Sequence, residues 1–112
     1  MTHREILNAL NEPTKQLHDL IPKVFEGYRA FHSAAFASGA LDAKTKELIA
    51  LGIAVAKQCD GCIAFHARAL ARHGATAEEV ADALGVAIMM DGGPGMIYAP
   101  RAMEAFLEFN RG

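Results

Sequence analysis

The stretch DAKTKELIALGIAVAKQCDGCIAFHARALARHG, residues 42–74, decides the fold of this chain. It lacks the alternation of apolar and polar residues that marks a half-buried strand, and alanine is frequent throughout it. Asp42 is a suitable N-cap for a helix over about 43–57. A second helix should begin around Cys59–Cys62 and run to His73, and the glycine that follows is its stop. The stretch therefore predicts two consecutive helices joined by a short turn.

Helix signals also precede this stretch. Thr2 and Glu5 fit a capping box, which opens a short helix that should end near Pro13. Pro22 suits the first turn of another helix, in which apolar residues follow at helical spacing until Gly39 stops it. Two helices are therefore expected on the N-terminal side.

The C-terminal part of the chain carries similar helix start and stop signals. Thr76 and Glu79 form a second capping box, and a helix should run from there to about Met90. The sequence Asp91-Gly92-Gly93-Pro94-Gly95 has the composition of a loop. A last helix is expected from about Pro100 to Phe109.

Length and composition limit the classes of protein that this chain can belong to. Its 112 residues suit a single domain, and 52% of them are hydrophobic, as in a globular protein. The sequence therefore predicts one all-α domain of five or six helices over residues 1–112.

Charge and hydropathy limit the partners of the chain. With a formal charge of −2, the sequence shows no basic patch of the kind that binds nucleic acid. No secretory signal and no apolar run of membrane-spanning length is present, so we expect a cytoplasmic protein without a membrane partner.

Two of the predicted helices are unusually apolar. Residues 48–56 and 80–90 carry apolar groups on nearly all sides, and helices of this kind need burial all round. A monomer of this size has little interior to offer both of them, unless the two helices simply fill its core. We therefore expect self-association, with Gly52 and Gly85 allowing close helix contact.

The residues Cys59-Asp60-Gly61-Cys62 carry the chemistry. Two cysteines at this spacing in a cytoplasmic protein favour redox or metal chemistry over a structural disulfide. Asp60 and Gly61 suit a tight turn, so Cys62 should lie in the first helical turn, where free N–H groups and the helix dipole favour a thiolate. His66 lies four residues further on, hence on the same side of the helix as Cys62, within reach of a direct or one-water hydrogen bond.

Glu47 should reach the same place through the helical hairpin. It lies about ten residues before the turn and His66 about seven after it, or roughly 15 and 10 Å from the corner at 1.5 Å per residue. Antiparallel packing would bring the carboxylate to the imidazole. Glu47 would then orient His66, and His66 would take the proton from a thiol.

A peroxide would convert one of these sulfurs to a sulfenic acid, and the other sulfur would condense with it to a disulfide. We assign the attack to Cys62, because it lies on the His66 side, and the resolving role to Cys59. The two roles could also be exchanged.

A zinc site is the main chemical alternative. Cys59, Cys62 and His66, with Glu47 or His73 as the fourth ligand, would satisfy tetrahedral coordination. However, the chain has no second CxxC and no HxxxH, and its apolar core does not need a structural metal, so we expect none. A thioredoxin-type motif would follow a strand, whereas a helix precedes this one.

Other aromatic residues and histidines receive simpler roles. The aromatic residues are expected in the core or at an interface, some of them walling a pocket over the thiols: Phe25, Tyr28, Phe31, Phe36 and Phe65. The sequence spacing suggests no interaction partner for the remaining histidines. Surface roles are therefore expected for His3, His18 and His32.

The pattern of Glu47 followed by Cys59-x-x-Cys62-x-x-x-His66 resembles the AhpD-like alkylhydroperoxidase branch of the carboxymuconolactone decarboxylase superfamily. The resemblance extends from about Ile21 to Phe109, which we take as the core of the domain. It implies an all-α, orthogonal-type fold that assembles as a homotrimer or homohexamer, with the site near a subunit interface. It also implies a peroxidase in which the glutamate, the histidine and the second cysteine form a proton relay without metal or other cofactor.

The expected function is therefore that of a dithiol peroxidase acting on hydrogen peroxide or organic hydroperoxides. The resemblance implies a lipoyl-type dithiol as reductant, and a thioredoxin-type dithiol is the other candidate. Some peroxidases of the branch have a histidine between the cysteines, where this chain has Gly61. Two alternatives stay open: a thiol–disulfide oxidoreductase or redox sensor that acts on a protein partner, and a non-enzymatic oligomeric binding module.

Overall fold

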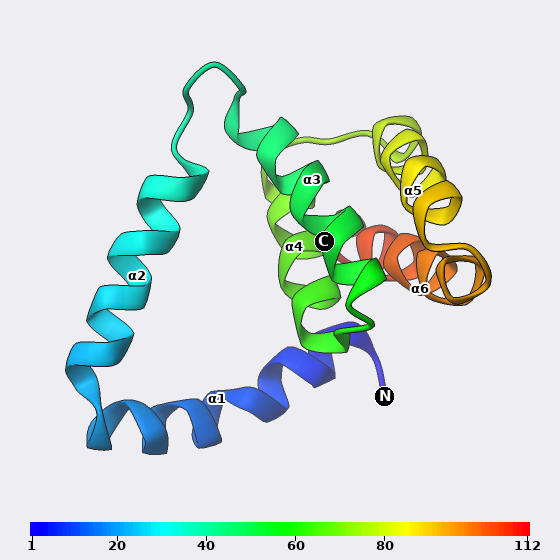
Figure 1. Cartoon of the computed structure of the whole chain (residues 1–112). Helices are drawn as coiled ribbons and strands as arrows, with labels where there is room; N and C mark the ends of the chain where they lie inside the picture. The colour runs from blue at the N-terminus through cyan, green and yellow to red at the C-terminus, as the bar shows by residue number, and fades with distance from the viewer.

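The computed structural model describes residues 1–112, which form six α-helices and no strand. In chain order the helices are α1 (His3–Leu20), α2 (Pro22–Phe36), α3 (Ala43–Ala56), α4 (Asp60–Arg72), α5 (Ala77–Asp91) and α6 (Gly93–Asn110) (Figure 1). The all-α prediction with five or six helices is confirmed. None of the helices combines the length and the apolar character needed to cross a bilayer.

Three helix starts occur where the sequence predicts them. The Thr2 hydroxyl accepts the backbone N–H of Glu5, and the Glu5 carboxylate accepts that of Thr2, which completes the capping box. Thr76 and Glu79 form the same reciprocal pair at the start of α5. Asp42 caps α3 by accepting the N–H at the third helical position. Side-chain acceptors therefore satisfy otherwise free N–H groups at each start.

The prediction that prolines bound two of the helices is wrong. α1 continues through Pro13 to Leu20, and α6 begins at Gly93 and contains Pro100. Both prolines lie at exposed positions, where water can hydrate the carbonyl that loses its N–H donor. The cost of an internal proline is therefore reduced on these solvent-facing sides.

The loop predicted over residues 91–95 is also wrong, because only Gly92 separates α5 from α6. The φ angle of Gly92 is 72°, in the left-handed region that favours glycine, and it lets the chain reverse in one residue. Gly95 lies where α6 crosses α5: a Cβ at this position would be 3.0 Å from the Cα of Ile88. The glycine-rich sequence therefore serves a close helix crossing.

Gly95→Ala is expected to lower the free energy of unfolding by about 1–3 kcal/mol, because backbone atoms of α5 would have to move away from the new methyl group. Gly85→Ala is the matched control, since a Cβ there meets nothing within 4 Å in a helix interior. It should be neutral or stabilise by up to about 1 kcal/mol. Urea unfolding measures both, and equal stabilities of the two variants would contradict the close crossing.

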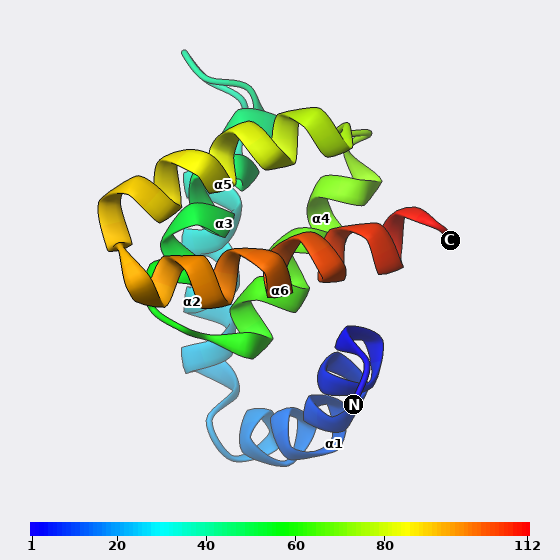
Figure 2. The same ribbon diagram turned by 90° about the vertical axis from the view of Figure 1, so that its right-hand side faces the viewer.

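The core lies between the last four helices. Sixteen buried apolar residues form one cluster, and its largest fully buried side chains are Phe106, Leu51, Ile63, Leu70, Val55 and Val80. α3 and α4 form an antiparallel hairpin, and α5 and α6 lie next to each other across it (Figures 1 and 2). This packing fixes the hairpin on which the cysteines and Glu47 lie.

α1 and α2 form an arm beside this core. No residue of α2 is buried, and Figure 1 shows α2 standing apart from the hairpin. α1 is tied to α6 by His3, whose Nε2 lies 2.8 Å from Glu104, and by Glu108, which accepts the backbone N–H groups of His3 and Arg4. The surface role predicted for His3 is wrong, since only 7% of this residue is exposed.

Apolar side chains cover much of the surface. Tyr28 and Phe31, which were expected in the core or at an interface, do not pack in the core, because they are 66% and 72% exposed in the single chain. Their place at an interface stays a prediction. α3 and α5 bury one side each and leave Ile49, Ile53 and Val86 about half exposed or more. The alternative that these two helices simply fill the monomer core is therefore wrong, while self-association itself stays a prediction.

Candidate active site

The α3–α4 hairpin brings Glu47 and His66 together, as the spacing predicts. Oε2 of Glu47 lies 2.8 Å from Nδ1 of His66. Only 4% of Glu47 is exposed, so its carboxylate is buried beside the imidazole rather than solvated on the surface of α3. A buried carboxylate needs a hydrogen-bonded partner, and His66 supplies it.

This contact fixes the chemistry of the imidazole. A carboxylate can only accept a hydrogen bond, so Nδ1–H of His66 donates to Glu47. The other ring nitrogen, Nε2, is then the one with a free lone pair. This arrangement can take up a proton at Nε2.

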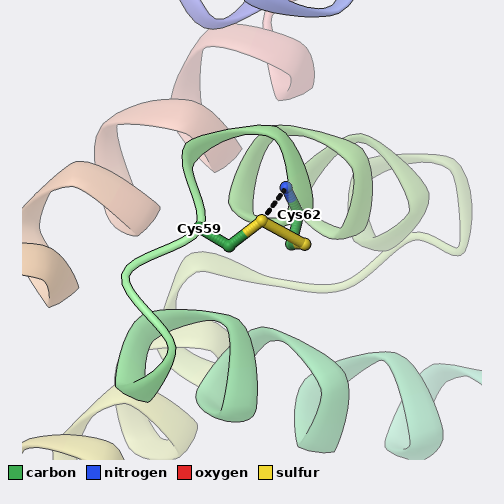
Figure 3. The surroundings of a disulfide bond; sticks show 2 residues. All are labelled: Cys59 and Cys62. Carbon is green, nitrogen blue, oxygen red and sulfur yellow. Dashed lines mark hydrogen bonds between the residues drawn. A yellow bond between two sulfur atoms is a disulfide. The ribbon is translucent and has the colours of Figure 1, made fainter. Parts of the chain in front are cut away.

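Cys59 and Cys62 form a disulfide at the start of α4, with their Cα atoms 5.2 Å apart (Figure 3). Cys62 lies in the first turn of α4, as predicted. Cys59 is the N-cap of the helix, and its Sγ accepts the backbone N–H of Cys62 at 3.2 Å. This capping role is not visible in the sequence, because cysteine is not among the residues that signal an N-cap.

The two sulfurs therefore have different surroundings. The Cys59 sulfur faces the positive end of the α4 dipole and an N–H donor, both of which favour a thiolate. Cys62 is the more exposed residue and lies one turn before His66 on the same helix. In this disulfide-bonded state the imidazole hydrogen-bonds to Glu47 and to neither sulfur.

Aromatic rings surround His66. The Phe36 ring is stacked on the imidazole with centroids 5.6 Å apart, and the Phe65 ring meets it edge-on at 5.2 Å. Phe36 and Phe65 thus lie against His66, while the expectation that aromatic residues wall a pocket over the thiols stays a prediction. The surface role expected for His32 is wrong: its ring stacks on Phe36 with centroids 4.5 Å apart, and its Nε2 is buried without a partner.

Gly61 between the cysteines lies beneath α1. A Cβ at this position would be 3.4 Å from Cδ1 of Leu10. A side chain at this position would thus be in ordinary van der Waals contact with Leu10. No three histidine, cysteine, aspartate or glutamate side chains converge in the manner of a metal site.

Comparison with known proteins identifies the family. A model of the carboxymuconolactone decarboxylase family matches residues 22–105. The chain belongs to this family.

Family members of known structure are similar to this chain along most of its length. A carboxymuconolactone decarboxylase family protein from Legionella pneumophila is 44% identical, with a TM-score of 0.94 over 96% of both chains. A family protein from Thermotoga maritima, for which a part in an antioxidative response has been suggested, is 31% identical. Its TM-score is 0.71 over 78% of this chain and 90% of the other.

A relative from Cupriavidus necator, itself uncharacterized, is 38% identical over 93% of this chain and 92% of its own. The carboxymuconolactone decarboxylase family and its helical fold are thus shown, and both agree with the resemblance seen in the sequence.

Proposed function

We propose that this family member is a dithiol peroxidase that reduces hydrogen peroxide or organic hydroperoxides through the Cys59–Cys62 disulfide. The observation that carries the proposal is the buried Glu47–His66 pair, 2.8 Å apart, one helical turn from a cysteine pair at the N-terminus of α4. A base held by a buried carboxylate beside two thiols is the arrangement that activates a sulfur nucleophile. The antioxidative response suggested for the Thermotoga maritima relative agrees with this chemistry.

In the oxidative half of the reaction, Nε2 of His66 takes the proton of the Cys62 thiol. The thiolate attacks one oxygen of the hydroperoxide, so that an S–O bond forms and the O–O bond breaks. The alkoxide takes a proton from His66 and leaves as an alcohol, or as water when the substrate is hydrogen peroxide. Cys62 is left as a sulfenic acid.

In the second half, the Cys59 thiol attacks the Cys62 sulfenic acid, which releases water and forms the disulfide. An external dithiol of the lipoyl or thioredoxin type then reduces the disulfide by two exchange steps and is itself oxidised to a disulfide. The N–H of Cys62 stabilises the Cys59 thiolate when it is released. The cytoplasm, which we propose as the location, keeps such dithiols reduced.

A hydroperoxide assay with dithiothreitol as reductant tests the proposal. Pre-reduced wild type should consume tert-butyl hydroperoxide faster than the Cys59→Ser/Cys62→Ser variant, and equal rates would reject it. Rapid reduction of a protein disulfide with negligible peroxide turnover would instead identify an oxidoreductase acting on a protein. Thiols that resist iodoacetamide in the native state would indicate an inert binding module.

We also propose that the chain assembles as a homotrimer or homohexamer. Two open apolar surfaces support self-association. One is a groove of about 430 Å³ between α3 and α5, lined mainly by Leu48, Ile49, Ile53, Ala83, Val86 and Met90. The other lies on the arm, where Leu17, Ile21, Val24, Phe25 and Tyr28 line a hollow of about 340 Å³. Exposed apolar patches of this kind mark interaction surfaces.

Light scattering should give three or six times the chain mass of 12.0 kDa. Ile53→Lys and Val86→Lys, which place charges in the groove, should each reduce this mass, because a charge is costly to bury in an apolar contact. Leu107→Lys on α6 is the control, since Leu107 is 42% exposed and lies outside the groove. A wild-type mass equal to that of one chain would reject the assembly.

A further inference from the structure

A cavity of about 240 Å³ lies beside the Glu47–His66 pair and is lined by residues of α2, α3 and α4 and by His73. Its lining combines the buried carboxylate of Glu47 with two aromatic rings and two guanidinium groups. The lining residues are His32, Phe36, Glu47, Phe65, Arg68, Ala69, Arg72 and His73. The proton relay uses only Glu47 from this set, so the arginines have no role in the chemistry described above.

Arg68 and Arg72 lack acidic partners. The chain has five side-chain ion pairs within 4.0 Å, and neither arginine takes part in any of them. Arg4 joins them in the lining of a second hollow of about 260 Å³. Burial lowers the pKa of Arg68, and the charges of Arg72 and Arg4 lower it further. Three like charges thus gather in a chain whose formal charge is −2.

A solvated basic surface explains Arg72 but not Arg68. Arg72 is exposed and ends α4, where a positive charge is favourable beside the helix dipole. Arg68 is half-buried in the interior of the helix, with its guanidinium 5.5 Å from the centre of the Phe65 ring. The Phe65 ring stabilises this cation in part, and a bound anion would further offset the repulsion from the neighbouring like charges. Guanidinium groups are well suited to carboxylates.

Cys62 and part of the cavity lining share one side of α4, while Arg68 lies about a third of a turn round the helix from Cys62. Cys62, Phe65, Ala69 and Arg72 follow one another at intervals of three, four and three residues, which places them along a single stripe of the helix. At a rise of about 1.5 Å per residue, Cys62 is roughly 9 Å along the axis from Arg68 and roughly 15 Å from Arg72. Phe65 lies between them and offers an apolar ring.

We propose that the preferred substrates are hydroperoxides of fatty acids or of similar amphipathic carboxylic acids, a choice that rests on the peroxidase function proposed above. Arg68 and Arg72 bind the carboxylate, and the apolar stem lies against Phe65 and Phe36. The hydroperoxide group reaches Cys62, roughly 9–15 Å away along the helix. The oxygen transfer is the one described above, and the product is the hydroxy acid.

A comparison of one fatty-acid hydroperoxide with its methyl ester tests this inference. The two substrates share chain and peroxide but differ in the charge that the arginines would bind. They are compared below their micelle concentrations, with the neutral reductant dithiothreitol. We expect kcat/KM of the wild type to be about tenfold higher for the acid than for the ester. This is the difference expected when one charge-assisted hydrogen bond is lost.

Arg68→Gln/Arg72→Gln should abolish this preference, because the rate for the acid falls to that for the ester. Arg29→Gln, which removes a positive charge from α2 outside the cavity, should keep it. Equal rates for acid and ester in the wild type would overturn the inference while the peroxidase function stands. An equal loss of both rates in the double variant would overturn it as well, since the arginines would then act on the structure rather than on the carboxylate.

If neither hydroperoxide is consumed, the proposed peroxidase function is wrong. A binding measurement then tests separately whether the cavity binds a carboxylate. Titration calorimetry with the unreactive hydroxy fatty acid should give about tenfold weaker binding to the double variant than to the wild type. Equal binding would reject the carboxylate site. Circular dichroism of each variant establishes that the helices are intact, and the single variants Arg68→Gln and Arg72→Gln replace the double one if it does not fold.

Discussion

Cys62→Ser is expected to lower kcat/KM for hydroperoxide reduction by at least about a thousandfold, to the rate without protein. A serine hydroxyl at this position has neither the acidity nor the polarisability of a thiol, so no sulfenic acid can form. The loss should be complete at every concentration of dithiol, because the first half of the reaction is removed. Continuous detection of the hydroperoxide measures it.

Cys59→Ser is the informative counterpart, because it removes only the resolving thiol. This variant should consume about one equivalent of hydroperoxide per chain and then accumulate the Cys62 sulfenic acid, which dimedone traps. A monothiol should restore slow turnover. If Cys59→Ser instead abolishes the first turnover and Cys62→Ser keeps it, the roles of the two sulfurs are exchanged, as the N-cap position of Cys59 would then explain.

Glu47→Gln is expected to lower the rate of hydroperoxide reduction by about 10²–10⁴-fold, the usual contribution of a positioned general base. The amide has the size of the carboxylate, so the hairpin should keep its packing. What is lost is the negative charge that holds Nδ1–H of His66 and leaves Nε2 free for the thiol proton. The rate of thiol alkylation near neutral pH should fall as well, and an unchanged rate would remove Glu47 from the mechanism.

The same pair should also affect stability. His66→Ala leaves the carboxylate of Glu47, which is 4% exposed, without its partner, and should cost about 3–5 kcal/mol of the free energy of unfolding. Adding Glu47→Leu should recover much of this loss, because no buried charge remains. Urea unfolding of the two variants measures the difference. A double variant as unstable as His66→Ala alone would show that the charge is not the cause.

Local signals predicted most of the fold. The two capping boxes and the N-cap Asp42 involve residues only three positions apart, so sequence alone identifies them. The same is true of the Glu47–His66 contact, because helix rise and a short turn fix the register of a hairpin.

Features that depend on contacts between residues far apart in the chain could not be predicted from local sequence signals. The partners of His3 are Glu104 and Glu108, which lie at the other end of the chain. Gly95 signals a loop by composition, but its function is to let two helices cross. Pro13 and Pro100 are tolerated because their sides of the helices face water, which no local pattern shows.

The candidate site was predicted only in part, because some of its residues come from segments that are distant in the sequence. Glu47, Cys59, Cys62 and His66 follow from spacing along one hairpin. The cavity beside them takes residues from three helices, so neither the stacking of His32 on Phe36 nor the gathering of Arg4 with Arg68 is visible in the sequence. Apolar periodicity also does not distinguish a core from an interface, which is why both positions were expected for Tyr28 and Phe31.

The mass of the reduced protein after one equivalent of hydroperoxide tests the dithiol mechanism most directly. Wild type should lose two hydrogens as the Cys59–Cys62 disulfide forms, and Cys59→Ser should gain one oxygen on Cys62. Digestion and fragmentation locate both changes on the cysteine peptide rather than on methionine. A wild-type mass that stays unchanged, with both thiols still open to alkylation, would contradict the mechanism.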